Sequence, residues 1–179
     1  QFLDPDGRFP NHVPNPEAQE AMDAICLAVK ENQADFGIIF DTDVDRAAAV
    51  DGRGEQINRN RLIALSAAVV LEERPGSTIV TDSITSDGLT DFIENTLGGR
   101  HHRFKRGYKN VINEAIRLNR EGNESWLAIE TSGHAAMKEN YFLDDGAYLV
   151  TKILIKLAKL RKEGKSLQDL IGKLPEPAE

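Results

Sequence analysis

The sequence is poor in the residues that mark several classes of protein. Its 179 residues include one cysteine, Cys26, so no disulfide can form within the chain. No apolar run approaches the roughly 20 residues that a membrane-spanning helix needs. No signal-peptide pattern stands at its start. These absences predict a protein without a membrane segment in a reducing compartment, most simply the cytoplasm.

Positive charge is also scarce. Lys and Arg number 22 against 29 Asp and Glu, which gives a formal net charge of −7. Nucleic-acid binding usually needs a basic face, and no run of Lys and Arg is long enough to supply one. An acidic chain can still bind a phosphorylated metabolite through a local group of cations. With 40% hydrophobic residues the chain can bury a core, so we expect a globular protein that binds no nucleic acid.

Hydrophobic periodicity predicts helices and short strands in alternation. The predicted helices begin at 15–17, span 59–73, 87–97, 108–120 and 145–160, and begin once more at 166–170. The predicted strands span 36–40, 47–50, 77–81, 102–105 and 126–129, with a hairpin-type turn at 51–54. From residue 59 onward helix and strand alternate, which favours an α/β fold with layered helices on a mixed, largely parallel sheet.

The chain is expected to contain two domains. Turn residues at 51–60 mark the best candidate for a boundary. The first part, 1–57, is too short for a complete α/β domain, so we expect it to lack strands that precede Gln1 in a longer protein. The absence of an initiator Met, with a turn-rich stretch directly after Gln1, also suggests an excised piece. The second domain would span 58–174, and 175–179 would be a tail.

Three aspartates follow the apolar run 36–40. Asp41, Asp43 and Asp45 alternate in the sequence, and Arg46 comes directly after them. A loop of this kind can direct several carboxylate oxygens at one hard divalent cation. Arg46 would suit a phosphate group that the metal shares. A solvated acidic turn is the simpler alternative, but three alternating Asp after an apolar strand favour a metal site.

Two other families also place aspartates at this spacing. An EF-hand requires Gly at its sixth position and Glu at its twelfth, where this sequence has Arg46 and Gly52, so that reading fails. A haloacid-dehalogenase-type phosphotransferase has a strand that ends in Asp-x-Asp, with the first Asp as nucleophile. Residues 40–44 fit that pattern loosely, and Asp144-Asp145 would be its late acidic pair.

Polar residues also follow the predicted strand 126–129. Glu130 and Ser132 can hydrogen-bond to sugar hydroxyls, and His134 can exchange a proton near neutral pH. Loops at the carboxyl ends of parallel strands are where α/β proteins bind ligands. Taken alone, a histidine held by structural hydrogen bonds is the simpler reading.

A third polar segment, 104–109, carries Lys105, Arg106 and Lys109 at a predicted strand-to-helix junction. The start of a helix adds partial positive charge, so the junction suits an anion. An ordinary basic surface turn is the simpler reading of this segment by itself.

Together, in this order, these motifs resemble the α-D-phosphohexomutases, the family of phosphoglucomutase and phosphomannomutase. The segment 41–46 is similar to the family's metal loop, Asp-Gly-Asp-x-Asp-Arg, with Thr42 in place of Gly. Residues 105–108 resemble its Lys-x-Gly loop, and 130–134 resemble its sugar loop, Glu-x-Ser-Gly-His. The segments 4–10 and 14–17, Lys138-Glu139 and 144–146 also resemble neighbouring parts of the family sequence. The resemblance implies the family's middle-domain fold, covering part of its second and most of its third domain.

Two departures limit what the resemblance implies. The family's phosphoryl carrier is a serine in a Thr-Ala-Ser-His-Asn-Pro-like loop, and no such run occurs here. The family also has a C-terminal domain that binds the substrate phosphate, and the sequence stops soon after the sugar-loop domain. We therefore expect the isolated chain to lack mutase activity.

The resemblance implies that the parent protein interconverts hexose 1-phosphate and hexose 6-phosphate through a hexose bisphosphate, with a phosphoserine outside this chain. Asp41, Asp43 and Asp45 would bind Mg²⁺. Arg46, Lys105 and His134 would act on the phosphoryl group and on the proton of the reacting hydroxyl. Glu130, Ser132 and Lys138 would bind the substrate. Nothing in the sequence separates glucose from mannose.

Two hypotheses from other classes stay open. In the first, the chain is a binding module that holds a sugar phosphate or a metal without catalysis. Alternatively, an exposed apolar face or edge left by the strands missing from 1–57 would drive homodimerisation.

Overall fold

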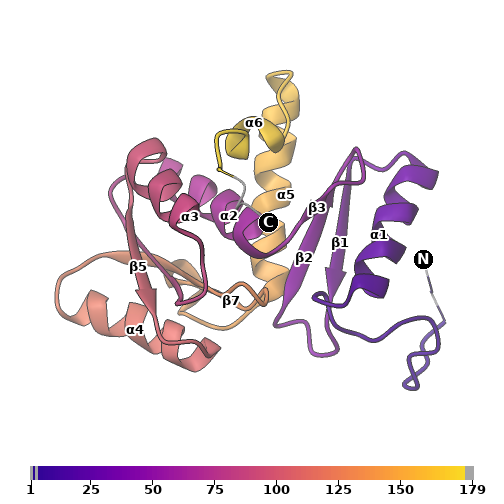
Figure 1. Ribbon diagram of the computed structural model, residues 1–179, viewed down its shortest axis with the longest axis horizontal. Helices are drawn as coiled ribbons and strands as arrows, with labels where there is room; N and C mark the ends of the chain where they lie inside the picture. The colour runs from indigo at the N-terminus through magenta and orange to yellow at the C-terminus, as the bar shows by residue number, and fades with distance from the viewer. Residues whose placement is uncertain (1, 3, 176–179) are drawn as a thin grey trace.

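The computed structural model describes residue 2 and residues 4–175, and most of the predicted tail lies outside these residues. Two sheets lie side by side, with the long helix α5 (Gly146–Lys162) between them (Figure 1). Among the described residues, no helix is both long and apolar enough to cross a bilayer.

The first sheet has three antiparallel strands in the order β1-β2-β3. These are β1 (Phe36–Phe40), β2 (Ala47–Asp51) and β3 (Gln56–Ile57). Helix α1 (Gln19–Asn32) covers one face through a cluster of Met22, Val29, Ala48 and Val50, against which Cys26 packs partly buried. Ala21 and Val29 are also buried on this face and Ile25 packs partly buried against it, whereas Leu27 is exposed.

The second sheet has four strands in the order β5-β4-β6-β7. β4 (Thr78–Asp82) is parallel to both β5 (Arg100–Phe104) and β6 (Ser125–Ile129), while β7 (Ala135–Met137) is antiparallel to β6. The predicted mixed, largely parallel sheet is confirmed for this part of the chain. Helix α4 (Tyr108–Arg120) covers one face of it, through Val111, Ala115 and Leu118.

The main core lies on the other face of the second sheet. Helix α2 (Arg59–Glu73) has ten consecutive buried residues, from Leu62 to Leu71, because α5, α6 (Gln168–Ile171) and the sheet surround it. The segment α3 (Asp87–Asp91) continues directly into a π-helical turn, η1 (Phe92–Thr96), where the sequence predicts one helix. A short 3₁₀ turn, η2 (Lys138–Asn140), follows β7.

Three helix starts differ from the prediction. The first helix begins at Gln19, because the side chain of Asn15 closes a preceding turn by accepting the Glu17 N–H at 2.9 Å. Asp145 lies outside α5 and caps it by accepting the Tyr148 N–H. Ser166 lies before α6 and donates from its backbone and its hydroxyl to Asp169. The helices themselves lie where the sequence places them.

The two halves repeat one unit. In each, a helix leads into a five-residue strand, a polar loop and an antiparallel strand: α1, β1, 41–46 and β2 in the first, α4, β6, 130–134 and β7 in the second. Each loop closes in the same way. Asp41 N–H donates to the Arg46 carbonyl at 3.4 Å, and Glu130 N–H donates to the His134 carbonyl at 2.9 Å. The predicted metal and sugar loops therefore occupy equivalent positions.

Candidate active site

The metal loop, residues 41–46, brings its three carboxylates together. Asp41, Asp43 and Asp45 each offer one oxygen, and these oxygens lie within 4.8 Å of one another. Asp41 is buried, Asp43 is exposed and Asp45 is half-buried. Hard divalent cations prefer several carboxylate oxygens of this kind. The group is therefore open to solvent on the Asp43 side and supported by protein on the Asp41 side.

Arg46 is tied to the first of these aspartates. Its Nε donates to Asp41 Oδ2 at 2.6 Å, and its backbone N–H donates to Asp41 Oδ1 at 3.2 Å. Burial alone would raise the pKa of Asp41, but the hydrogen bonds from Arg46 outweigh it and lower that pKa. Asp41 therefore stays ionised and holds the guanidinium beside the metal loop.

The charge of Asp45 is disfavoured by its surroundings. Burial, followed by the hydrogen bond and charge of Asp41, raises the pKa of Asp45 to about 6, although the charge of His134 acts in the opposite direction. Its Oδ1 is buried and has no hydrogen-bond partner among the described residues. A buried carboxylate oxygen without a partner favours a proton or a bound cation. This feature fits a cation at the metal loop.

The sugar loop, residues 130–134, is held from within. Glu130 is buried, and its Oε1 accepts the backbone N–H of Gly107 at 2.7 Å, which ties the sugar loop to the loop that carries Lys105. Ser132 Oγ lies 3.4 Å from the other carboxylate oxygen of Glu130. Burial raises the pKa of Glu130. In this structure Glu130 joins two loops, in addition to any contact with a sugar.

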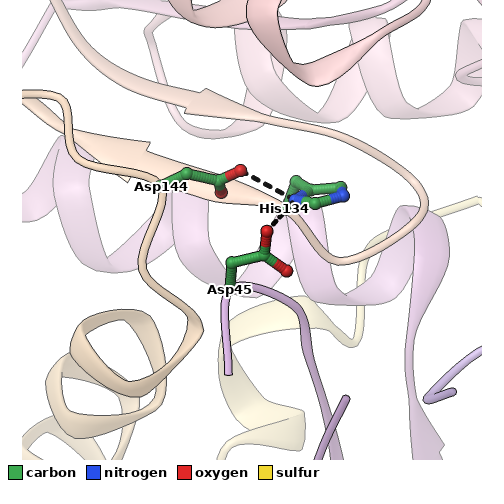
Figure 2. A group of neighbouring side chains, drawn as sticks. All are labelled: Asp45, His134 and Asp144. Atoms are coloured by element: carbon green, nitrogen blue, oxygen red, sulfur yellow. Dashed lines mark hydrogen bonds and ion pairs between the residues drawn. The ribbon is translucent and has the colours of Figure 1, made fainter. Parts of the chain in front are cut away.

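His134 lies at the centre of the site. Its Nδ1 is 2.8 Å from Asp144 Oδ2 and 3.6 Å from Asp45 Oδ2, so carboxylates from two loops meet at one ring nitrogen (Figure 2). Burial disfavours its charge, but the hydrogen bond and charge of Asp144, with the charge of Asp45, raise the pKa of His134. The ring of Tyr108 stacks on the imidazole at 4.7 Å between centroids. The imidazole is therefore held at one edge and over one face.

Backbone contacts join the metal loop to the second half. Arg46 and His134 form an antiparallel bridge, and the Ala47 N–H donates to the Gly133 carbonyl at 3.3 Å. Gly133 has φ +99°, and a Cβ there would lie 2.5 Å from the carbonyl oxygen of Ala47. Gly146, the first residue of α5, donates its N–H to the Val44 carbonyl at 3.0 Å. Two glycines thus let the metal loop pack directly on the backbone of the second half.

The other predicted site residues lie in two places. Lys105 is exposed on the loop after β5, two residues before the Gly107 that Glu130 holds. Lys138 lies away from the group, because β7 runs antiparallel to β6 and carries it towards the start of that strand. Its amino group is 4.7 Å from the ring centre of Trp126 and 3.7 Å from Glu124. The structure therefore brings together the metal loop, the sugar loop and the Lys105 loop, and leaves Lys138 outside.

Three further residues shape the site, although none of them was among the predicted phosphohexomutase site residues. Asp144 orients His134, and Tyr108 stacks on it. Asp82, fully buried at the end of β4, accepts the N–H and the hydroxyl of Thr131, at 3.2 and 2.6 Å. The sequence could have shown that Asp82 lies near the sugar loop, because Asp82 ends a strand and the carboxyl ends of neighbouring parallel strands meet at one edge of the sheet.

A large cavity lies elsewhere. It has a volume of about 710 Å³ and lies between the end of α1, the turn after β2 and the connection of α5 to α6. None of the predicted site residues lines it. Its cationic rim is largely paired within the protein, for example Arg161 with Asp35 and Arg53 with Asp51. The predicted site residues therefore lie outside this cavity.

The fold and the site define an α/β protein with a carboxylate-rich loop beside a hydrogen-bonded histidine. Comparison with known proteins gives the family. Sequence models described as phosphoglucomutase/phosphomannomutase, alpha/beta/alpha domain II and domain III, match residues 1–54 and 58–178. The chain belongs to the phosphoglucomutase/phosphomannomutase family, as its motifs predict.

Similar proteins give the same family name. A phosphomannomutase/phosphoglucomutase of Pseudomonas putida is 36% identical over 93% of this chain and 35% of its own length. A phosphoglucomutase of Neisseria gonorrhoeae is 32% identical over 98% of this chain and 37% of its own length. The crystal structure of a family protein from Burkholderia thailandensis superposes with a TM-score of 0.83, at 32% identity, over 99% of this chain and 37% of that one. The chain thus spans about a third of the length of these relatives, which confirms the prediction that it corresponds to a part of such a protein.

Proposed function

We propose that this chain supplies the metal-binding and sugar-binding loops of a phosphohexomutase that interconverts hexose 1-phosphate and hexose 6-phosphate, using a phosphoserine outside this chain. One observation carries the proposal. Asp45 belongs to the three-carboxylate group of the metal loop and also contacts the histidine of the sugar loop. The bridge between Arg46 and His134 brings the two loops together. A cation, a phosphoryl group and a sugar hydroxyl would meet at this point.

Residues 1–57 would be the later part of the second family domain and 58–174 the third. The remaining domains of the parent would be partners of these two, and hexose phosphate and hexose bisphosphate would be the ligands. Family membership argues against the dehalogenase-type alternative, as does the use of both Asp41 oxygens to accept from Arg46. A cytoplasmic location is part of the proposal and agrees with the single cysteine.

Mg²⁺ fits the metal loop. Asp41, Asp43 and Asp45 would hold it, and the buried Asp45 oxygen that has no partner in the described part of the chain supports a bound cation. When bound, the ion would neutralise charge on the transferred phosphoryl group. Deprotonated Asp45 is the binding form, so binding below pH about 6 would release a proton from Asp45.

The chain's own residues would handle the proton and the phosphate. Because Asp144 holds Nδ1 of His134, the opposite ring nitrogen is the one placed to exchange a proton with a sugar hydroxyl. Arg46, fixed by Asp41, would hold the phosphoryl group as a planar cation. Lys105 would add positive charge. Ser132 and Glu130 would form hydrogen bonds with sugar hydroxyls.

A chimaera tests this proposal. Residues 1–179 would replace the aligned region of the Pseudomonas putida relative, and mutase turnover would be measured with glucose 1-phosphate and with mannose 1-phosphate. We expect turnover by the chimaera and none by the isolated chain. His134→Ala in the chimaera should reduce turnover strongly, whereas Lys159→Ala, an exposed cation far along α5, should leave it unchanged.

The outcomes separate the hypotheses. A folded chimaera that binds glucose 1-phosphate but gives no turnover with either sugar would favour the binding-module hypothesis. Native-like turnover by the isolated chain would contradict the need for an external phosphoserine. The ratio of the two turnover rates also indicates which hexose the loops of this chain prefer.

A further inference from the structure

A second group of metal-binding side chains lies next to the metal loop. Asp45, His134 and Asp144 each offer one ligand atom, and these atoms lie within 4.8 Å of one another. The three residues come from separate segments: the metal loop, the sugar loop and the connection between β7 and α5. We call them the histidine–aspartate group. It shares Asp45 with the three carboxylates of the metal loop but differs from them in offering a nitrogen ligand.

The distances within the histidine–aspartate group suit a small ion. Nδ1 of His134 lies 2.8 Å from Asp144 Oδ2 and 3.6 Å from Asp45 Oδ2, and Figure 2 shows both carboxylates directed at this nitrogen. Zn²⁺ binds nitrogen and carboxylate oxygen at about 2.1 Å in a tetrahedral arrangement, which places its ligand atoms about 3.4 Å apart. The two observed distances lie on either side of this value. A small outward movement of the Asp144 carboxylate would therefore admit such an ion.

The protein already holds these ligands in place. Asp144 pairs with Ala136 in an antiparallel bridge, and its Oδ1 accepts the Ala135 N–H at 3.1 Å. Its Oδ2 is thereby left for the imidazole or for a metal. The side chains of Asp144 and His134 are 13% and 16% exposed, whereas that of Asp45 is 27% exposed. The group is therefore fixed from the side of the second sheet and more open on the side of the metal loop.

Two polar atoms of the group are available for this role. Asp45 Oδ1 is buried and has no hydrogen-bond partner in the described part of the chain. A buried carboxylate oxygen without a partner favours a bound cation. The hydrogen bond that the structure gives to the His134 ring is made at Nδ1, so Nε2 can carry the ring proton while Nδ1 binds a metal.

The ligand set selects a class of ion. Mg²⁺ and Ca²⁺ bind oxygen ligands, which is the chemistry of the metal loop. Imidazole nitrogen suits Zn²⁺, Co²⁺, Ni²⁺ and Cu²⁺, and Zn²⁺ also accepts carboxylate oxygens. One nitrogen and two oxygens from the protein would leave a fourth position for water, as in zinc sites that are not closed. The two neighbouring groups therefore differ in the ions that they favour.

We propose that Asp45, His134 and Asp144 bind a divalent transition-metal ion such as Zn²⁺, with Nδ1 of His134 as the nitrogen ligand. The ion takes the place of the proton between Nδ1 and Asp144, and the neutral ring carries its one proton on Nε2. This site does not depend on the proposed mutase activity, since it rests on the ligand geometry of this chain and is tested with the metal alone.

Titration of the chain of residues 1–179 with Co²⁺, followed by visible absorption, tests the site. A four-coordinate Co²⁺ with a nitrogen ligand absorbs strongly, whereas six oxygen ligands give a weak spectrum. We expect a strong, saturable band that Zn²⁺ removes. His134→Ala and Asp144→Asn should each weaken Co²⁺ binding at least about tenfold. Asp43→Asn, in the metal loop but outside the group, should retain the band, and so should His102→Ala, which removes a histidine paired with Glu114.

The unmodified chain supplies a second measurement that needs no variant to fold. In ¹⁵N NMR spectra of the histidine rings, Zn²⁺ should shift the Nδ1 signal of His134 more than its Nε2 signal. The proposal is wrong if no strong Co²⁺ band forms, if Asp43→Asn removes the band while Asp144→Asn retains it, or if Zn²⁺ shifts only the other histidines. Circular dichroism shows which variants are folded and can be compared.

Discussion

The metal loop and the sugar loop have the same place in a repeated unit but opposite chemistry. In the metal loop, Asp43 is exposed and one oxygen of Asp45 has no partner among the described residues. In the sugar loop, Glu130 is bound to Gly107, and Asp82 accepts from Thr131 beside it. The metal loop leaves carboxylate charge available for a cation, whereas the polar groups of the sugar loop form hydrogen bonds within the protein that hold the loop in place. The same scaffold thus carries one loop with an exposed carboxylate and one whose glutamate is hydrogen-bonded within the protein.

The largest expected effect comes from the contact that joins the two loops. Gly133→Ala should destabilise the chain by about 3 kcal/mol, because it combines backbone strain with a clash in a packed position. The clash is between the new Cβ and the Ala47 carbonyl, and the strain comes from φ +99°. Urea unfolding followed by circular dichroism measures the change.

Gly122→Ala is the matched control. Gly122 has φ +83°, but a Cβ there would meet nothing within 4 Å. This variant should lose only about 1 kcal/mol, the cost of a left-handed alanine. Equal losses in the two variants would mean that the contact between the loops contributes nothing.

The next effect concerns metal binding, which is proposed for the metal loop and not for the sugar loop. Asp43→Asn should weaken Mn²⁺ or Mg²⁺ binding about tenfold, which is about 1.4 kcal/mol, because one of three carboxylates is lost. Thr42→Ala, an exposed neighbour, should leave binding unchanged. Isothermal titration calorimetry measures both. Unchanged affinity in Asp43→Asn would mean that the ligand set is wrong.

Metal binding should also depend on pH. Asp45 must lose its proton to bind a cation, and its pKa is raised to about 6. Affinity should therefore fall as pH drops through 6 and level off above it. An affinity that stays constant between about pH 5 and about pH 7, one pH unit on either side of this pKa, would show that Asp45 binds no metal.

A smaller effect concerns His134 in metal-free buffer. Its pKa is raised by Asp144 and Asp45 against the effect of burial, so the protonated ring stabilises the folded chain. This stability is fully present below the unfolded pKa of about 6.5 and is lost as pH rises through the higher folded pKa. Asp144→Asn should therefore cost about 1 kcal/mol at low pH, and less at high pH.

Glu124→Gln is the control for this pH dependence, since Glu124 is an exposed carboxylate near Lys138. Unfolding at several pH values, with the NMR titration of the His134 ring, measures the difference. A lower pKa for His134 than for a free histidine would contradict the assignment of Asp144.

The smallest effect concerns the ring that stacks on His134. Tyr108→Ala should cost about 0.5 kcal/mol, in the range measured for aromatic pairs, and should shift the NMR signals of the imidazole. Tyr108→Phe keeps the ring and should keep both stability and shifts. If the Phe variant behaves like the Ala variant, the phenol hydroxyl rather than stacking holds the histidine.

The sequence predicts much of the fold because long elements have strong patterns. The helices 59–73 and 108–120 and the strand 36–40 have the predicted bounds. The shorter strands β3 and β7, of two and three residues, have too few residues to show a period. The repeat of the two halves was also invisible, because it lies in the pairing of strands and the closure of loops.

For the site, residue type shows what chemistry is available but not where each group points. The carboxylates of 41–45 gather as their spacing predicts. The position of Lys138 is decided by the direction of β7, and the stacking of Tyr108 by the meeting of α4 with the sugar loop. These are contacts between distant segments, which no local pattern contains.

The most direct measurement is the paramagnetic broadening of backbone NMR signals by Mn²⁺, which takes the same oxygen ligands as Mg²⁺. The proposed ion would lie at Asp41, Asp43 and Asp45, beside His134 across the bridge. Signals of 41–46 and of 132–134 should broaden first and together, while those of Gly122 and Lys138 stay sharp. Broadening confined to other acidic surfaces, or to 41–46 without 132–134, would contradict the claim that the two loops form one site.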